Sequence, residues 1–326
     1  NNNNKNYNNK NNKNNKNDFI TEFMLLQDDI ETATATAAVL PLWLSLPVCL
    51  WKCEQKRKSL TSLLSLTLQN IDKDVQNGIL SSDDSFGIWY NGMKSNNQSI
   101  DDIAELCIGL LFAAHKNPAI AAAQSILFLI ESSSSSSSTI SYLDRAYQEI
   151  DSNINNSSLF DQSLDNFSFI TNVVLETLRL TAHSIGAMRK VVSEEGWKIE
   201  QLKDDGNKIE HIIPYGSYVG VTHIVPHRDP EKWGNDSNKF NPDRLQLLEK
   251  SKDIRLFTTF SSGVHICPGR HIAIMLVRLV VIVFLQNYEL RKPSVLHKIS
   301  KVSFERATLA QREEKCQIFI KKRSNN

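Results

Sequence analysis

The fold of this chain is decided by Phe260-Ser-Ser-Gly263-Val-His265-Ile-Cys267-Pro268-Gly269-Arg-His-Ile-Ala273, the sequence from residue 260 to residue 273. This stretch places a cysteine between a glycine-containing loop and an apolar helix that we expect over residues 269–287. Pro268 suits the first position of that helix, so Cys267 would stand at the helix N-terminus. Unpaired N–H groups and the helix dipole at such a place favour a thiolate over a thiol.

The glycines of this loop add a second property. Gly263 and Gly269 lack a Cβ, so the backbone can approach a flat ligand closely. A Cys-Pro-Gly triplet taken alone also fits an unreactive core cysteine beside an ordinary helix start, because free cysteines are often simply buried. The triplet therefore leaves both interpretations of Cys267 open.

The complete pattern resembles the haem-binding signature of the cytochromes P450. That signature is Phe, two residues, Gly, three residues, Cys, one residue, Gly, three residues and Ala, and every anchor is present here. The resemblance implies that Cys267 is the metal ligand, a thiolate on the iron of haem b. It also implies a cofactor-binding loop that contains Phe260, Gly263, His265 and Gly269. His265 stands where the family usually has Arg, whose cation neutralises a haem propionate, and histidine does so less fully at neutral pH.

Two further motifs similar to those of the family follow the expected order. Glu176 and Arg179 stand three residues apart, so one helix face presents both and they can pair. Such a pair also fits an ordinary surface ion pair. Arg244, in Phe240-Asn-Pro-Asp-Arg244, resembles the family's second arginine, which joins the pair in a buried triad. The resemblance implies that Glu176, Arg179 and Arg244 brace the core on the haem side, in a structural role.

Arg189 follows Arg179 by ten residues. In proteins of the family, an arginine at this offset binds a haem propionate, and a guanidinium suits that carboxylate. The alternative is a solvated arginine on a strand. The sequence leaves both interpretations of Arg189 open.

The helix expected over residues 99–131 departs most from the family. Ser99 is a plausible N-cap, the apolar body should be buried all round, and Pro118 should kink or open it. The family's oxygen-handling helix usually carries an acid followed by Thr, whereas this chain has Lys116 and Asn117 there. The resemblance gives His115 and Asn117 the catalytic places. The alternative for His115 and Lys116 is that they merely face a helix or a water channel.

The same helix also indicates the substrate class. Asn117 is similar to the residue found in the branch that holds sterol side-hydroxylases and prostacyclin synthase. The segment Leu110-Leu-Phe-Ala113 is similar to the sterol demethylases. A sterol- or lipid-like substrate is therefore implied.

The rest of the chain predicts a mainly α domain with small β-sheets. Apolar residues at helical spacing predict further helices, and short β-rich runs predict strands. Residues 1–18, with twelve Asn and four Lys, cannot bury apolar surface and should be disordered. The serine run 132–138 should be a flexible linker. The helices are expected over 53–76, 140–150 and 164–180, and the strands over 187–192, 198–201 and 218–225, with small hairpins in the tail.

The resemblance covers residues 19–326, as a partial P450 catalytic domain that is incomplete at its N-terminus. The family's membrane anchor, N-terminal sheet and early helices are not recognised in this sequence. No apolar stretch reaches the roughly 18 residues that cross a bilayer. We expect the complete protein on the cytosolic face of the endoplasmic reticulum membrane, held there by an N-terminal anchor that this sequence lacks.

The charge balance bears on the class of binding partner, and the cysteine content bears on the cellular compartment. The chain has 37 basic and 36 acidic residues, a balance that argues against nucleic acid. Its five cysteines are an odd number at scattered spacings, so they do not form a disulfide framework and fit a reducing compartment.

The family resemblance implies a haem-thiolate monooxygenase that hydroxylates a hydrophobic substrate with O₂. Two electrons would come from an NADPH-dependent reductase, because the chain shows no flavin or nicotinamide motif. Asn117 leaves open an isomerase of the same haem-thiolate type that needs no O₂. The missing N-terminal third leaves open an inactive, truncated remnant.

Overall fold

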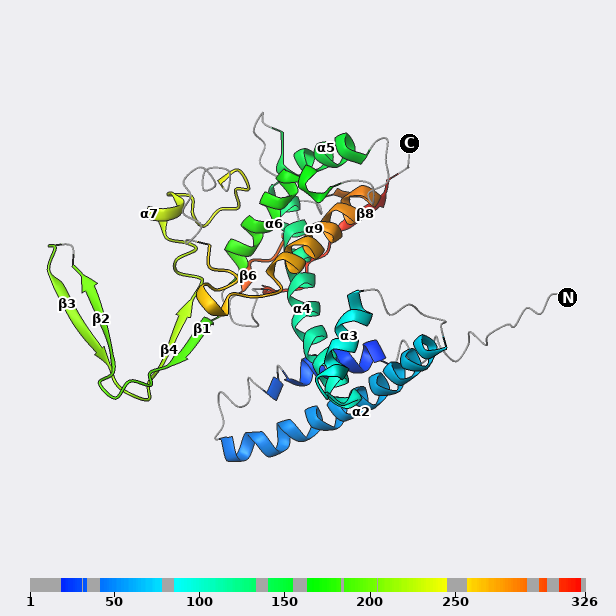
Figure 1. The fold of residues 1–326 in the computed structure, drawn as a ribbon. Coiled ribbons are helices and arrows are strands. Elements are labelled where there is room, and N and C mark those ends of the chain that lie inside the picture. The colour runs from blue at the N-terminus through cyan, green and yellow to red at the C-terminus, as the bar shows by residue number, and fades with distance from the viewer. Residues whose placement is uncertain are drawn as a thin grey trace. The chain divides into compact units, whose positions relative to one another are not determined.

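The computed structural model describes residues 19–30, 32–33, 42–77, 85–132, 140–154, 163–182, 185–203, 205–244, 257–291, 299–303 and 311–323. The predicted disordered tract 1–18 lies outside the described residues, as does all of the serine run except Ser132. The chain divides into two compact units, Asn1–His115 and Lys116–Asn326. The described residues confirm the predicted class, mainly helical with small sheets (Figure 1).

The first unit is built from helices. Residues 19–30 form one helix, and α2 (Leu42–Gln76), α3 (Ser85–Ser95) and the first part of α4 (Ile100–Ser132) follow. Helix α2 begins earlier than predicted and contains Pro47, and α3 was not predicted. Two apolar clusters stabilise this unit. One contains Phe23, Leu26, Cys53, Leu60 and Ile108, and the other contains Leu68, Tyr90, Ile103 and Ala104.

Helix α4 begins at a capping box. The Asp102 N–H donates to Ser99 Oγ, and the Ser99 N–H donates to the Asp102 carboxylate, both at 3.1 Å. These two bonds satisfy backbone donors that the first turn would otherwise leave unpaired. The predicted N-cap is therefore confirmed. Pro118 lies inside the helix, which continues to Ser132.

The prediction that α4 is buried all round was wrong for its first half. Leu110 and Phe112 are 54% and 38% exposed. Only the face that carries Ile103 and Ile108 packs into the clusters of the first unit, so the described residues cover one side of these turns. From Ala121 onwards the helix contributes to the core of the second unit.

The second unit is centred on three helices that pack on one another, namely α5 (Tyr142–Ile154), α6 (Ser168–Thr181) and α9 (Arg270–Asn287) (Figure 1). Short helical turns lie in the connections: η2 (Leu164–Asn166), α7 (Pro230–Trp233) and η4 (Gly263–His265). The last turns of α4 complete the core. The fully buried residues of this core include Leu129, Ile130, Ile150, Ile170, Val173, Val281, Ile282 and Leu285.

The strands of this unit form antiparallel pairs. Strand β1 (Ile185–Lys190) pairs with β4 (Tyr218–Thr222), and β2 (Trp197–Leu202) pairs with β3 (Lys208–Ile213). Strand β5 (Tyr288–Arg291) pairs with β8 (Phe319–Lys322), and β6 (Val302–Ser303) pairs with β7 (Gln311–Arg312). Strand β3 was not predicted. Most of its side chains are exposed, so its sequence has no regular alternation of apolar and polar residues.

Two charged side chains connect these elements. Glu149 of α5 accepts from the N–H groups of Phe169 and Ile170 at 2.7 and 2.9 Å, which caps the first turn of α6 with an anion. Arg312 of β7 donates to Gln124 at 2.8 Å and to Glu131 at 3.0 Å. The later part of α4 is thereby bound to a strand near the end of the described chain.

Helices α4 and α9 are long and apolar enough to cross a bilayer, judged by length and composition alone. This finding corrects the prediction that no stretch of the chain reaches that length. Within the second unit, α9 buries Val277, Val281 and Leu285 in the core. It therefore has the properties of a core helix as well.

Candidate functional site

The Cys267 loop is held by core packing and by backbone hydrogen bonds. Phe260 packs against the core of the second unit, and the Cys267 N–H donates to the Phe260 carbonyl at 2.9 Å. Helix α9 begins only at Arg270, after a turn at Pro268 and Gly269. The prediction that Pro268 is the first helical residue was wrong, because the chain turns between the cysteine and the helix.

Cys267 is a half-buried free thiol with apolar neighbours in the loop and the helix start. Val264, Ile266 and Ile272 are 94%, 38% and 59% exposed. Exposed apolar side chains beside a cysteine are expected where a flat apolar ligand covers them. The exposed apolar side chains that flank Cys267 in the sequence therefore fit a porphyrin.

The two glycines of the loop serve different purposes. Gly263 has φ +73°, a left-handed conformation that residues with a Cβ adopt at a cost. Gly269 has an ordinary φ of −83°, but a Cβ there would lie 4.0 Å from the Cys267 sulfur. Glycine at 263 thus shapes the loop, and glycine at 269 leaves space beside the sulfur.

The two cations predicted for the haem propionates are both exposed. His265 ends the short helical turn η4, and Arg189 lies on β1 in the same unit as Cys267. The Arg189 guanidinium donates to the carbonyl of its neighbour Met188 at 2.9 Å. Their roles toward a cofactor remain predictions.

The predicted catalytic pair is divided between the two units. His115 belongs to the first unit, where its Nδ1 lies 3.3 Å from Gln27 Oε1 and its ring stands edge-on to Phe23 at 6.0 Å. Asn117 is half-buried on α4 in the second unit. The catalytic roles of His115 and Asn117 remain predictions.

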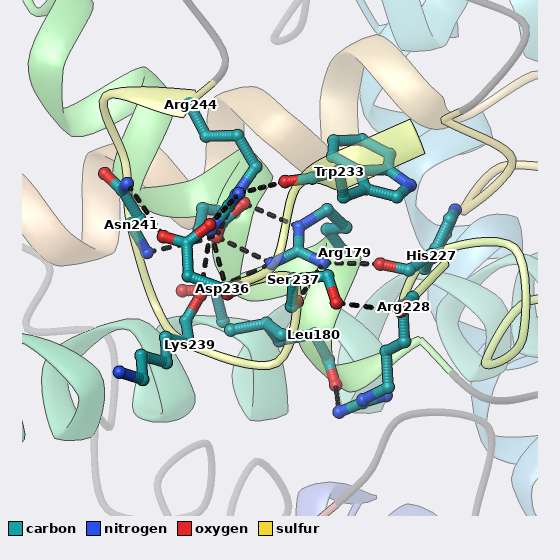
Figure 2. Close-up of polar contacts among 12 residues, drawn as sticks. Arg179, Leu180, His227, Arg228, Trp233, Asp236, Ser237, Lys239, Asn241 and Arg244 are labelled. Atoms are coloured by element: carbon teal, nitrogen blue, oxygen red, sulfur yellow. Dashed lines mark hydrogen bonds and ion pairs between the residues drawn. The ribbon is translucent and has the colours of Figure 1, made fainter. Parts of the chain in front are cut away.

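The structure brings the predicted triad of Glu176, Arg179 and Arg244 together, and Figure 2 labels its two arginines. Arg179 Nε and Nη2 donate to the two carboxylate oxygens of Glu176 at 2.7 and 2.8 Å. Arg244 Nε lies 3.5 Å from Glu176 Oε1. The side chains of Glu176 and Arg179 are wholly buried, and that of Arg244 is 7% exposed. The surface alternative considered for the Glu176–Arg179 pair is therefore wrong.

Arg179 has further partners that the sequence did not indicate. Its Nη1 donates to the backbone carbonyls of His227 and Ser237 (Figure 2). Its guanidinium carbon also lies 4.8 Å from the centre of the Trp233 ring, a cation–π arrangement. The carboxylate oxygen of Glu176 that accepts from Arg179 Nη2, Oε1, also accepts a hydrogen bond from the Asn241 N–H at 3.1 Å.

Arg244 is held mainly by a carboxylate outside the predicted triad. Its Nη1 donates to Asp236 Oδ1 at 2.7 Å and to the Trp233 carbonyl. The hydrogen bond from Arg244 lowers the pKa of Asp236 to about 2. Asp236 lies in an irregular connection, where no periodic pattern could mark it, and its only sequence signal was an acid eight residues before a motif arginine.

The sequence matches the family model described as Cytochrome P450 over residues 4–318. The chain belongs to the cytochrome P450 family. Members of this family hold haem b through a cysteine thiolate. The Cys267 loop of this P450 chain has the signature, the half-buried thiol and the flanking apolar residues that fit such a cofactor.

Proteins similar to this P450 chain are known from several organisms. It is 24% identical to echinocystic acid 23-monooxygenase of Saponaria officinalis over 298 residues, 85% of this chain and 53% of that protein. It is 23% identical to 11-oxo-beta-amyrin 30-oxidase of Glycyrrhiza uralensis over 278 residues, 81% of this chain and 50% of that protein.

A further relative is bifunctional cytochrome P450/NADPH–P450 reductase ALT2 of Alternaria alternata. The P450 chain is 26% identical to it over 152 residues, 46% of this chain and 13% of that protein. Compared with the two plant relatives, the P450 chain spans about half of their length.

Proposed function

We propose that residues 19–326 are part of the catalytic domain of a haem-thiolate monooxygenase, preceded by an Asn-rich tract over residues 1–18. The protein hydroxylates a hydrophobic, sterol- or lipid-like substrate with O₂ and two electrons. Cys267 would hold the haem iron as a thiolate ligand, and His265 and Arg189 would bind the propionates. His115 and Asn117 take part in proton delivery.

The observation that carries this proposal is the Cys267 loop. Its thiol is half-buried, and the loop and the helix start carry exposed apolar side chains, Val264 and Ile272 among them. When bound, haem supplies oxygen activation, to which a thiolate ligand contributes electron density. The chain itself binds and orients the cofactor through this loop, and the buried Glu176–Arg179 pair stabilises the core of the same unit.

The relatives support the substrate class and the redox partner. The two plant relatives are named for oxidation of echinocystic acid and 11-oxo-beta-amyrin, and one relative is named as a fusion to an NADPH–P450 reductase. A separate reductase is the electron donor in our proposal. The complete protein lies on the cytosolic face of the endoplasmic reticulum membrane, which would place it close to such a reductase and to apolar substrates.

The test is the absorption spectrum of the purified chain after reconstitution with haem, reduction and addition of CO. A red-shifted Soret band is expected for the wild-type chain. The band is expected to disappear in Cys267→Ala. It should persist in Cys316→Ala, which removes another half-buried free thiol. A band that survives Cys267→Ala would contradict the ligand assignment.

The same preparation separates the alternatives. A chain that retains no haem and shows no shifted band is the inactive remnant, and the monooxygenase proposal fails for it. An O₂-independent isomerase, which Asn117 favours, would turn over substrate without reductase and without O₂. The monooxygenase requires both.

A further inference from the structure

A buried histidine connects the ion network to the cysteine loop. His227 has no exposed surface, and its ring stacks between His223, at 5.7 Å between centroids, and Phe257, at 5.6 Å. The ring of Trp233 stands edge-on to it at 6.3 Å. His227 thus occupies a fixed position between residues of two loops.

The ring of His227 accepts a hydrogen bond from the backbone. The Thr258 N–H donates to His227 Nε2 at 3.0 Å. Because an amide N–H only donates, Nε2 carries no proton, and a neutral His227 must carry its proton on Nδ1. The Thr258 hydroxyl lies 3.3 Å from the same Nε2 and 2.8 Å from Nδ1 of His223.

The backbone of His227 belongs to the ion network. Its carbonyl accepts a hydrogen bond from Arg179 Nη1, the guanidinium that also pairs with Glu176 (Figure 2). On the other side, Thr258 stands two residues before Phe260, whose carbonyl accepts from the Cys267 N–H at 2.9 Å. A short chain of contacts therefore runs from Arg179 through His227 to the loop that carries Cys267.

We propose that neutral His227 is a positioning residue for the cysteine loop. Arg179 holds the backbone carbonyl of His227 by a hydrogen bond. The Nε2 atom of His227 holds the Thr258 amide at the point where the chain enters the loop. A protonated ring would place an N–H against the Thr258 N–H and release this connection. The inference rests on the proposed function only in that Cys267 is taken as the haem ligand.

The charges around the ring favour the neutral form. Burial, together with the charges of His223, Arg179 and Arg228, lowers the pKa of His227 to about 3. Burial also lowers the pKa of His223. The connection to Thr258 is therefore present at neutral pH.

Two substitutions at the same position test this role in the full chain without haem. His227→Phe keeps an aromatic ring but removes the acceptor, whereas His227→Gln places an amide oxygen near the position of Nε2. Hydrogen exchange of the Thr258 and Cys267 amides should be about five- to tenfold faster in His227→Phe, the equivalent of one lost hydrogen bond. His227→Gln should restore most of the protection. Unchanged exchange in His227→Phe, or equal exchange in the two variants, would overturn the inference.

A measurement on the wild-type chain decides the matter even if His227→Phe does not fold. The ¹⁵N chemical shifts of the imidazole should show a proton on Nδ1 and none on Nε2 at neutral pH. A proton on Nε2 would exclude the acceptor role. In the presence of haem, His227→Phe should retain less haem than His227→Gln. If the wild-type chain retains no haem, the proposed function fails, whereas the exchange and the ¹⁵N shifts still decide the role of His227.

Discussion

Arg179 and Glu176 form two parallel hydrogen bonds of 2.7 and 2.8 Å, and neither side chain is exposed to solvent. Removing water from two charges is costly, so such a pair holds only when the remaining hydrogen-bonding groups are also satisfied. The carbonyls of His227 and Ser237 and the N–H of Asn241 meet that need. The pair therefore depends on the connection 227–241 as much as on helix α6.

Glu176→Gln is expected to destabilise the second unit by about 3–5 kcal/mol, because it leaves the charge of Arg179 buried and uncompensated. Exchange of the α6 amides measures this loss. Glu200→Gln is the matched control, since Glu200 pairs with Lys208 at the same 2.7 Å but is 61% exposed. The control should cost less than about 1 kcal/mol. Equal losses in the two variants would contradict the importance of burial.

Stability should fall as the pH falls from about 6.5 towards 3, in part because of His227. Its pKa is about 3 in the folded chain and near 6.5 when unfolded, so the unfolded chain binds the proton first. The contribution is complete above pH 6.5 and decreases by about 1.4 kcal/mol per pH unit within that window. Urea unfolding at a series of pH values measures it. His227→Gln should remove this part of the slope, and an unchanged slope in that variant would argue against a neutral buried ring.

Asp236→Asn is expected to weaken the hold on Arg244 at neutral pH but not at pH 2. The folded pKa of Asp236 is about 2, below its ordinary value of 3.8, so its contribution is present above pH 3.8 and is lost as the pH falls through 2. We expect at most about 1 kcal/mol, since the Asp236 side chain is 43% exposed and water screens the pair. The difference in unfolding free energy between wild type and variant, followed against pH, tests this sign. A difference that grows towards low pH would refute it.

Gly263→Ala and Gly269→Ala should separate loop conformation from space beside the sulfur. Gly263→Ala forces a Cβ into a left-handed conformation and should cost about 1 kcal/mol of stability without haem. Gly269→Ala meets no such strain, so its stability should change by less than about 0.5 kcal/mol. Its added methyl would lie 4.0 Å from the Cys267 sulfur and should weaken haem retention. Thermal unfolding and haem content are the two measurements, and full retention of haem by Gly269→Ala would show that the space is not needed.

The sequence was informative where one local pattern carried the information. The spacing of Glu176 and Arg179 on one helix face predicted their pairing, and the apolar run after Cys267 predicted α9. Asp236 and His227 escaped prediction, because irregular connections have no period and their partners are fixed only by tertiary contacts. The exposure of Leu110 and Phe112 escaped for a similar reason, since a helix that is apolar all round does not reveal which face finds a partner.

The bonds of Arg312 also bear on how the chain is made. Arg312 binds Gln124 and Glu131, and about 180 residues separate it from either partner. During synthesis, the end of α4 leaves the ribosome long before β7 exists. Helix α9 contributes to the same core as α4, so in the nascent second unit the end of α4 lacks both of these partners until residues 270–312 have been made. Until then, the buried residues Leu129 and Ile130 lack part of the core that covers them in the folded chain.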